Sequence, residues 1–270
     1  MNVAVVIPAH CSRKVLHLTI GSWLVVRGDY DFSIDVGLHN NYEEYSPELE
    51  EIMSIEDLVD FHFVDEIDWH SERLMRYSKM HALNLMNIMV NLKDRDFTHV
   101  AILDNDLLFY SDFIGWVLEN HKDADVVGCL FGNRDFEFPH LTLDGGRATF
   151  APKFSIWHMV ISRRCFEKMV EDPSQMLPSE RVLSAEGHLM CHDTFSHGLK
   201  SAQGEWGFDV RTIPEIKVAT MVRHWGSASF NFGARNTTLT DRRDGRHSLH
   251  IKNIEDEHDR LFPEGIGHLI

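Results

Sequence analysis

The sequence predicts an α/β fold with a mostly parallel central sheet flanked by helices, similar to the Rossmann arrangement. Short apolar runs rich in Val and Ile alternate with helical patterns through residues 2–110, which is typical of βαβ units. Several of these runs are apolar without alternation, as expected of strands buried on both faces. A chain of 270 residues suits one large domain, or one domain with an appendage.

In the first half of the chain, apolar runs and helical periodicity define the expected elements. We expect strands at Asn2–Ile7, Phe32–Leu38, Val59–Val64 and Val100–Leu103. We expect helices at Lys14–Val26, Ser46–Ile55 and Ser71–Leu92, the second of them opening with a Ser cap and a Pro at the first helical position.

The second half is less regular, with a loop-rich stretch at residues 133–152. Helices are expected at Asp112–Glu119, Arg164–Val170 and Cys191–Leu199, and strands at Asp125–Leu130, Phe154–Ile161, Phe208–Ile213 and Lys217–Met221. Residues 227–270 are polar and are expected to be irregular or mobile.

Composition excludes several classes of function. The formal net charge of −16 argues against nucleic-acid binding, which depends on clustered Lys and Arg. The 4 cysteines are widely spaced without a CxxC pair, as in proteins of a reducing compartment. The N-terminus does not resemble a signal peptide, and no apolar run approaches the roughly 20 residues of a membrane span. We therefore expect a cytoplasmic protein without a transmembrane segment.

The most informative motif is Asp104-Asn105-Asp106, directly after the apolar run Val100–Leu103. Residues i and i+2 of an extended segment point to the same side, so the two carboxylates are expected to face one ion. Oxygen ligands suit Mg²⁺ or Mn²⁺, and ligands of open α/β sheets bind beyond the carboxyl ends of the strands. The alternative is a plain strand-to-helix turn in which Asp106 caps a helix.

Three stretches together resemble a GT-A glycosyltransferase of the family-2-like group. They are VAVVIPAH near the start, LTIGSWL in the first helix, and AILDND after a long helix, a DxD motif. The later CHDTFSHGLKSAQGEWGFDVRTIPEIKVATMVRHWG resembles the second half of such enzymes.

This resemblance implies one GT-A-like catalytic domain over residues 1–226, with a nucleotide-binding half at about 1–110 and an acceptor half at about 111–226. It implies transfer of a sugar from a nucleotide-sugar, such as a UDP- or GDP-sugar, to a carbohydrate or other hydroxyl acceptor. It also implies a divalent metal, Mn²⁺ or Mg²⁺, between the DxD carboxylates and the diphosphate.

The resemblance assigns nucleotide contacts to residues near the strand ends. Those expected to contact the donor are Pro8, Ala9, His10, Asn40, Lys79, Asp104 and Asn105. Lys79 has the alternative of being a solvated helix charge. The family usually has Asp at the end of the second strand, where this chain has His39-Asn40-Asn41, so the donor base is left open.

The metal ligands implied by the resemblance are Asp104, Asp106 and His224, with Asp104 alternatively contacting the ribose. His224, in Arg223-His224-Trp225-Gly226, has the alternative of being a surface residue bonded to backbone. Asp193 is the implied general base, which would take the acceptor proton, although it equally resembles a helix N-cap.

Further residues and functions remain open at this point. Trp157, beside His158, would stack on a sugar or lie in the core, and Arg235, Arg242 and Arg243 would close over the diphosphate. One alternative function is a metal-dependent hydrolase, suggested by the nearby His188, His192, Asp193 and His197. Another is a non-catalytic nucleotide- or sugar-binding module. The loop PAHCSRK lacks the glycines of a dehydrogenase GxGxxG motif.

Overall fold

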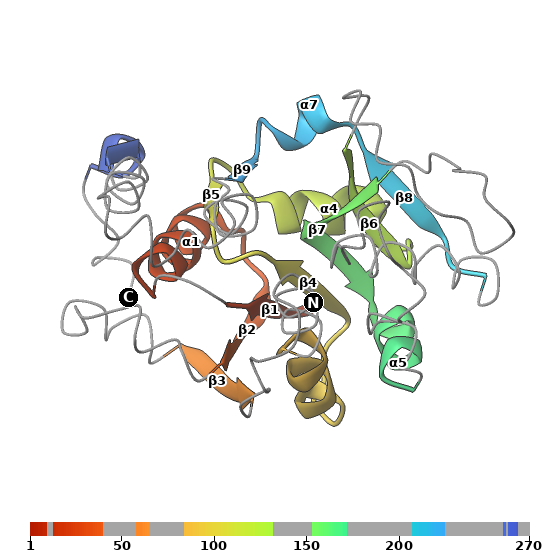
Figure 1. Ribbon diagram of the computed structural model, residues 1–270. Coiled ribbons are helices and arrows are strands. Elements are labelled where there is room, and N and C mark those ends of the chain that lie inside the picture. The colour runs from red at the N-terminus through yellow and green to blue at the C-terminus, as the bar shows by residue number, and fades with distance from the viewer. Residues whose placement is uncertain are drawn as a thin grey trace, which may run out of the picture.

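The computed structural model describes residues 1–9, 13–39, 58–64, 84–131, 153–171, 207–224, 256–257 and 259–263. Within these ranges it contains a seven-stranded sheet, a separate two-stranded ribbon, and helices on both faces of the sheet (Figure 1). The helices expected at Ser46–Ile55 and Cys191–Leu199 lie outside the described residues, as does the first part of Ser71–Leu92. Residues 84–92 of that last helix are helical as expected.

The sheet has the strand order β3-β2-β1-β4-β7-β6-β8. Its strands are β1 (Asn2–Pro8), β2 (Asp31–His39), β3 (Val59–Val64), β4 (His99–Leu103), β6 (Val126–Phe131), β7 (Lys153–Ser162) and β8 (Val210–Ile213). The strand β7 is antiparallel to both neighbours, whereas the other pairings are parallel. The prediction of a mostly parallel sheet in an α/β fold is therefore confirmed.

The central strands are apolar because both of their faces are covered. Every residue of β4 is buried, and β1 is buried from Val3 to Pro8. One apolar cluster packs α1 (Arg13–Val26) and α4 (Phe113–His121) against one face of the sheet. A second cluster packs residues 84–92 and α5 (Arg163–Glu171) against the other (Figure 1).

The two-stranded ribbon consists of β5 (Leu107–Phe109) and β9 (Val222–His224), which are antiparallel. The chain after the acidic motif thus enters a strand, and the alternative in which Asp106 caps a helix is wrong. The cap of the next helix is Asp112, whose side chain accepts a hydrogen bond from the Gly115 N–H. Apolar residues resume at Leu107 because β5 packs in the core, and not because a helix begins there.

The strand expected at Lys217–Met221 is wrong. The structure has a short helix, α7 (Glu215–Val218), and a turn before β9. Val218 and Met221 are buried three residues apart, while Ile216 is 82% exposed, a spacing that fits a helical turn better than a strand. The amides of Lys217 and Val218 both donate to the Pro214 carbonyl, which begins this turn.

The described part of the polar C-terminal segment also differs from the expected irregular structure. Residues 256–257 and 259–261 are helical. Arg260 forms an ion pair with Glu257 at 2.8 Å, three residues earlier, a spacing at which side chains on a helix meet. Arg235, Arg242 and Arg243, which were expected to close over a diphosphate, lie outside the described residues.

Candidate functional site

The acidic motif forms a tight turn between β4 and β5. Asp104, Asn105 and Asp106 are buried, with exposed fractions of 3%, 0% and 1%. Residues 105 and 106 are in a turn, so the expectation that the motif is an extended segment is wrong. The change of direction arises because β5 leaves the central sheet to pair with β9.

The buried face of α1 holds the backbone of this turn through Thr19 and that of the following strand, β5, through Ser22. The Thr19 hydroxyl donates to the Asn105 carbonyl at 2.8 Å and accepts from the Leu107 N–H at 3.0 Å. One helical turn later, the Ser22 hydroxyl accepts from the Phe109 N–H at 3.1 Å and donates to the Thr19 carbonyl at 3.0 Å. These two hydroxyls satisfy buried backbone groups that are costly to leave without a partner.

The end of β1 lies next to this turn. Val6 pairs with Ile102, and continuing the parallel register by two residues sets Pro8 level with Asp104. Pro8 and Ala9 are buried, and the Ala9 N–H donates to the Gly37 carbonyl of β2 at 2.8 Å. The structure therefore brings together two of the segments that the sequence assigned to a site.

Asn84 ties the ends of β1 and β2 together. Its buried side-chain amide donates to the Gly37 carbonyl at 2.8 Å and to the Ala9 carbonyl at 3.3 Å. The approach is close because Gly37 has no side chain: a Cβ there would lie 2.1 Å from Asn84 Oδ1 and 2.9 Å from Ile88 Cδ1. Asn84 thus sets the position of the backbone on which the predicted nucleotide loop begins.

These strand ends lie at the topological switch point of the sheet. From β1 the chain proceeds outward through β2 and β3, and β4 is then added on the other side of β1. In open α/β sheets, ligands bind in the crevice outside the carboxyl ends of the strands at such a point. Pro8 and Ala9 lie at the end of β1, on one side of the switch point. The acidic turn lies at the end of β4, on the other side.

Two histidines have backbones close to the acidic turn. His224 in β9 pairs with Leu107, the residue after Asp106, although nothing is described of its side chain. His158 in β7 pairs with Leu103, the residue before Asp104. His158 is 4% exposed. Its ring packs edge-to-face against the Phe113 ring, with the two ring centroids 5.3 Å apart. The roles considered for Trp157 stay open, because its side chain is not described.

Several expected site residues lie outside the described part of the chain. These are the proposed base Asp193, the donor contacts His10, Asn40 and Lys79, and the histidines His188, His192 and His197 of the hydrolase alternative. Their roles stay predictions.

The acidic turn offers oxygen atoms from two carboxylates and one amide, a set that suits a hard cation such as Mg²⁺ or Mn²⁺. Among the described residues, no group of three or more His, Cys, Asp or Glu is arranged to hold a metal ion. The side chain of His224 is not among them. The chemistry of the donor set therefore fits a divalent cation, with further ligands coming from other residues, water or substrate.

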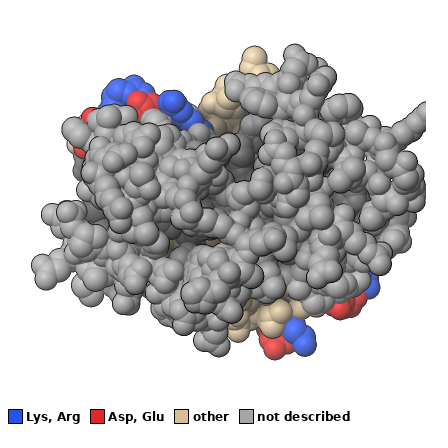
Figure 2. Space-filling view, in the orientation of Figure 1, with Lys and Arg blue, Asp and Glu red and all other residues tan. Residues whose placement is uncertain are grey.

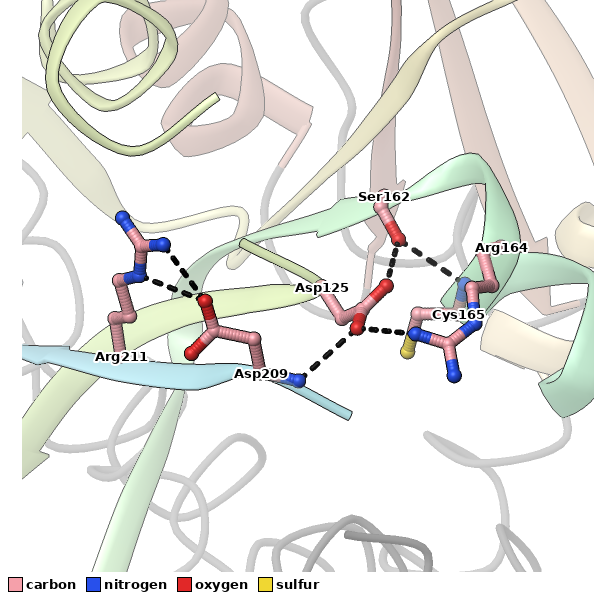
Figure 3. A network of polar contacts seen from close by, with 6 residues as sticks. All are labelled: Asp125, Ser162, Arg164, Cys165, Asp209 and Arg211. Atoms are coloured by element: carbon pink, nitrogen blue, oxygen red, sulfur yellow. Dashed lines mark hydrogen bonds and ion pairs between the residues drawn. The ribbon is translucent and has the colours of Figure 1, made fainter. Parts of the chain in front are cut away.

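A second buried carboxylate, Asp125, belongs to a polar network at the opposite edge of the sheet, where β6 begins. It accepts hydrogen bonds from Ser162 Oγ at 2.9 Å, from Arg164 at 2.7 Å and from the Asp209 N–H at 3.0 Å (Figure 3). Ser162 Oγ also accepts from the Cys165 N–H at 3.2 Å. Burial, followed by the charge of Asp125, raises the pKa of the Cys165 thiol, which keeps it protonated.

A third buried carboxylate, Asp35 of β2, is held by a hydrogen bond to His62 and an ion pair with Arg95. It lies 2.8 Å from His62 Nε2 and 3.1 Å from Arg95, which reaches Asp60 at 2.9 Å as well. Asp35 is fully buried, and unpaired charge in such a position is costly. The cluster joins the edge strand β3 to the loop after residues 84–92, and we assign it a structural role.

Asp112, the N-cap of α4, links that helix to the loop between α1 and β2. Asp112 accepts hydrogen bonds from the Gly28 N–H at 2.7 Å and from the Tyr30 hydroxyl at 2.9 Å. Burial, followed by the charge of Asp112, raises the pKa of the Tyr30 phenol, so the hydroxyl stays a donor. Asp112 is thus a structural carboxylate too.

Charges on the described surface are of mixed sign. Figure 2 shows blue and red atoms next to each other where the described residues reach the surface. Exposed ion pairs include Arg163–Glu167, Lys168–Glu171 and Arg260–Glu257. That the protein does not bind nucleic acid stays a prediction.

The sequence did not single out Thr19 or Asn84 as site residues. A signal for Thr19 exists, because Thr19 and Ser22 are small hydroxyl residues three positions apart among the apolar residues of one helix. Such a pair faces one side of the helix. Asn84 carries no comparable signal, since its partners Ala9 and Gly37 are far away in the sequence.

Comparisons with known proteins do not assign the chain to a family. No family model matches the sequence, and no curated protein matches it either. In the described part of the chain, every helix is too short or too polar to span a membrane.

Proposed function

We propose that the protein is a metal-dependent glycosyltransferase with a GT-A-like fold, which moves a sugar from a nucleotide-sugar to an acceptor hydroxyl. The observation that carries the proposal is the position of the buried turn Asp104-Asn105-Asp106 beside Pro8 and Ala9 at the switch point of an open α/β sheet. Ligand sites of such folds lie at this position.

The segment after β1 has properties that suit a diphosphate. The helix α1 starts at Arg13, shortly after Ala9, and runs back along the sheet, so its N-terminus lies at the same edge as the acidic turn. Backbone N–H groups and the helix dipole at an N-terminus favour anions. An acidic turn and a helix N-terminus together suit a diphosphate and the cation that accompanies it.

Asp104 and Asp106 would hold the cation, with His224 as a further ligand and Asp104 alternatively contacting the ribose. When bound, Mn²⁺ or Mg²⁺ would offset the negative charge that develops on the departing diphosphate. Pro8, Ala9, His10, Asn40, Lys79 and Asn105 would contact the nucleotide. The donor base and the sugar are not assigned.

In the transfer itself, the acceptor oxygen forms a bond to the anomeric carbon while the bond from that carbon to the phosphate oxygen breaks. The electron pair of the broken bond leaves with the diphosphate. In an inverting enzyme the proton of the acceptor hydroxyl goes to a carboxylate base, a role that we propose for Asp193. The acceptor half of the chain would supply this base.

A thermal-shift screen of UDP, GDP and their sugar derivatives, with and without Mn²⁺, tests the proposal. At a ligand concentration about 100 times the Kd, binding stabilises by about 2.7 kcal/mol, which raises Tm by about 5–10 °C in a protein of this size. We expect this rise with one nucleotide in the presence of Mn²⁺. It should be absent in Asp106→Asn and retained in the variant of an exposed residue, Asp94→Asn.

Incubation of the stabilising nucleotide-sugar with candidate acceptors then separates the classes of function. Transfer of the sugar supports a glycosyltransferase, whereas release of free sugar without an acceptor supports a hydrolase. Binding without turnover supports a non-catalytic module. If no nucleotide changes Tm with or without Mn²⁺, the proposal is wrong.

A further inference from the structure

Thr19 of α1 contacts the backbone of the acidic turn on both sides of Asp106. Its hydroxyl donates to the carbonyl of Asn105 and accepts from the N–H of Leu107, at 2.8 and 3.0 Å. Thr19 is 1% exposed, so water does not replace these bonds. We propose that Thr19 is a positioning residue that holds the turn in the conformation in which Asp104 and Asp106 bind the cation, an inference that rests on the proposed function.

The Thr19 hydroxyl points away from its own helix. Threonine within a helix commonly bonds the carbonyl of its own preceding turn. Here the hydroxyl bonds instead to a segment 86 residues away in the sequence. Because the χ1 angle of a β-branched side chain is restricted, this contact fixes a point on α1 relative to the turn.

The two hydrogen bonds of Thr19 constrain the backbone on both sides of Asp106. Asn105 O and Leu107 N belong to the peptide units on either side of Asp106, so fixing both sets the direction in which the Asp106 backbone presents its side chain. Carboxylates must be held within a fraction of an ångström of the geometry that a cation requires. No carboxylate oxygen takes part in these two bonds, so they can set the geometry without competing with the ion.

The helix α1 links the two segments of the candidate site. It follows the predicted nucleotide loop after Ala9 and lies beside β5 (Figure 1), and its Thr19 bonds to the acidic turn. Residues of α1 and β5 are in contact along this boundary. Thr19 thus connects the segment expected to contact the nucleotide with the segment expected to hold the metal.

The chain offers a matched control. Ser22 lies one turn further along α1, is fully buried, and uses its hydroxyl to accept from a β5 amide, that of Phe109, at 3.1 Å. Phe109 is three residues beyond Asp106. Ser22→Ala therefore removes the same kind of bond between the same two elements without releasing the peptides beside Asp106.

The test measures Mn²⁺ binding to the full chain, by the loss of the free Mn²⁺ signal in electron paramagnetic resonance, with Mn²⁺ alone and with added UDP or GDP. We expect Thr19→Val to weaken Mn²⁺ binding about tenfold or more, in the range found for outer-shell partners of metal ligands. Thr19→Ser should restore the affinity to within about twofold, because it keeps the hydroxyl. Ser22→Ala should lower Tm about as much as Thr19→Val and leave the affinity unchanged.

The outcomes separate this inference from the proposed function. If the parent protein does not bind Mn²⁺, or if Asp106→Asn binds it equally well, the proposed function is wrong and this inference is wrong with it. If it does bind, but Thr19→Val binds equally well, or Ser22→Ala weakens binding as much, then only the positioning role is wrong. Should Thr19→Val not fold, Thr19→Cys, whose thiol is a weak donor and acceptor, is compared with Ser22→Cys. The same difference in affinity is expected between them, and its absence overturns the inference.

Discussion

Two buried aspartates at opposite edges of the sheet are held in different ways. Asp125 precedes β6 and lies at the amino edge, since Val126 and Val100 both pair with Ile161 of β7. Asp106 lies at the carboxyl edge, after β4. At Asp125 the carboxylate itself accepts three hydrogen bonds from its surroundings. At Asp106 the structure fixes the neighbouring backbone through Thr19.

The two edges suit different roles. A carboxylate that binds Ser162, Arg164 and a backbone amide joins β6, β7 and β8, and its removal leaves partly buried donors without their acceptor. A turn whose backbone is secured independently keeps its conformation when a side chain in it is altered. Residue type and burial are alike at the two positions, and the two differ in their place in the sheet: Asp106 follows β4 at the carboxyl edge, where ligands of open α/β sheets bind.

The largest expected effect is the loss of stability in Asp125→Ala. Two partly buried donors, the Ser162 hydroxyl and the Asp209 N–H, lose a charged acceptor, at about 1–2 kcal/mol each. We expect the free energy of unfolding to fall by about 2–4 kcal/mol in urea denaturation, without a change in Mn²⁺ affinity. Asp106→Ala should abolish Mn²⁺ binding. Loss of Mn²⁺ binding in Asp125→Ala, or its retention in Asp106→Ala, would show that the two aspartates do not differ as proposed.

A smaller effect is expected from Gly37→Ala at the carboxyl edge. The new Cβ would lie 2.1 Å from Asn84 Oδ1, so Asn84 must turn away from the Gly37 and Ala9 carbonyls. We expect a loss of about 1–3 kcal/mol, the usual range for overpacking, measured by urea denaturation. Gly28→Ala, whose Cβ would approach Asp112 at the looser distance of 2.8 Å, provides a comparison. A Gly37→Ala variant as stable as the parent would contradict the close packing of residues 84–92 on β2.

The smallest effect is a pH dependence from His99 at the amino end of β4. Its Nε2 donates to the Lys122 carbonyl at 3.2 Å, and burial lowers the pKa of His99 below its usual value of 6.5. The unfolded chain therefore binds this proton more readily than the folded one. The contribution of neutral His99 to the free energy of unfolding is therefore complete above pH 6.5, and it is lost as the pH falls below 6.5 towards the lower pKa of the folded state.

Thermal unfolding of the parent and of His99→Gln between pH 7.5 and 5.5 measures this contribution. We expect Tm of the parent to fall more steeply with decreasing pH than Tm of the variant. Parallel curves would mean that His99 titrates alike in the folded and unfolded chain, which would contradict this prediction.

The sequence by itself determined the fold class and the positions of most strands and helices that the structure describes. Apolar runs such as Val100–Leu103 and helical periodicity such as Lys14–Val26 are local signals, because the burial of both faces of a strand, or of one face of a helix, dictates residue type. The same reasoning failed at Lys217–Met221, where a short apolar run fits either a strand or a helical turn.

Only the tertiary structure decided how the acidic motif is held and what lies beside it. The pairing of β5 with β9, the contacts of Thr19 with Asn105 and Leu107, and the bridge from Asn84 to Gly37 all join residues far apart in the chain. A hydroxyl or an amide in a sequence does not reveal its partner, because hydrogen-bond partners depend on which elements the fold brings together. The distinction between Asp106 and Asp125 is of this kind.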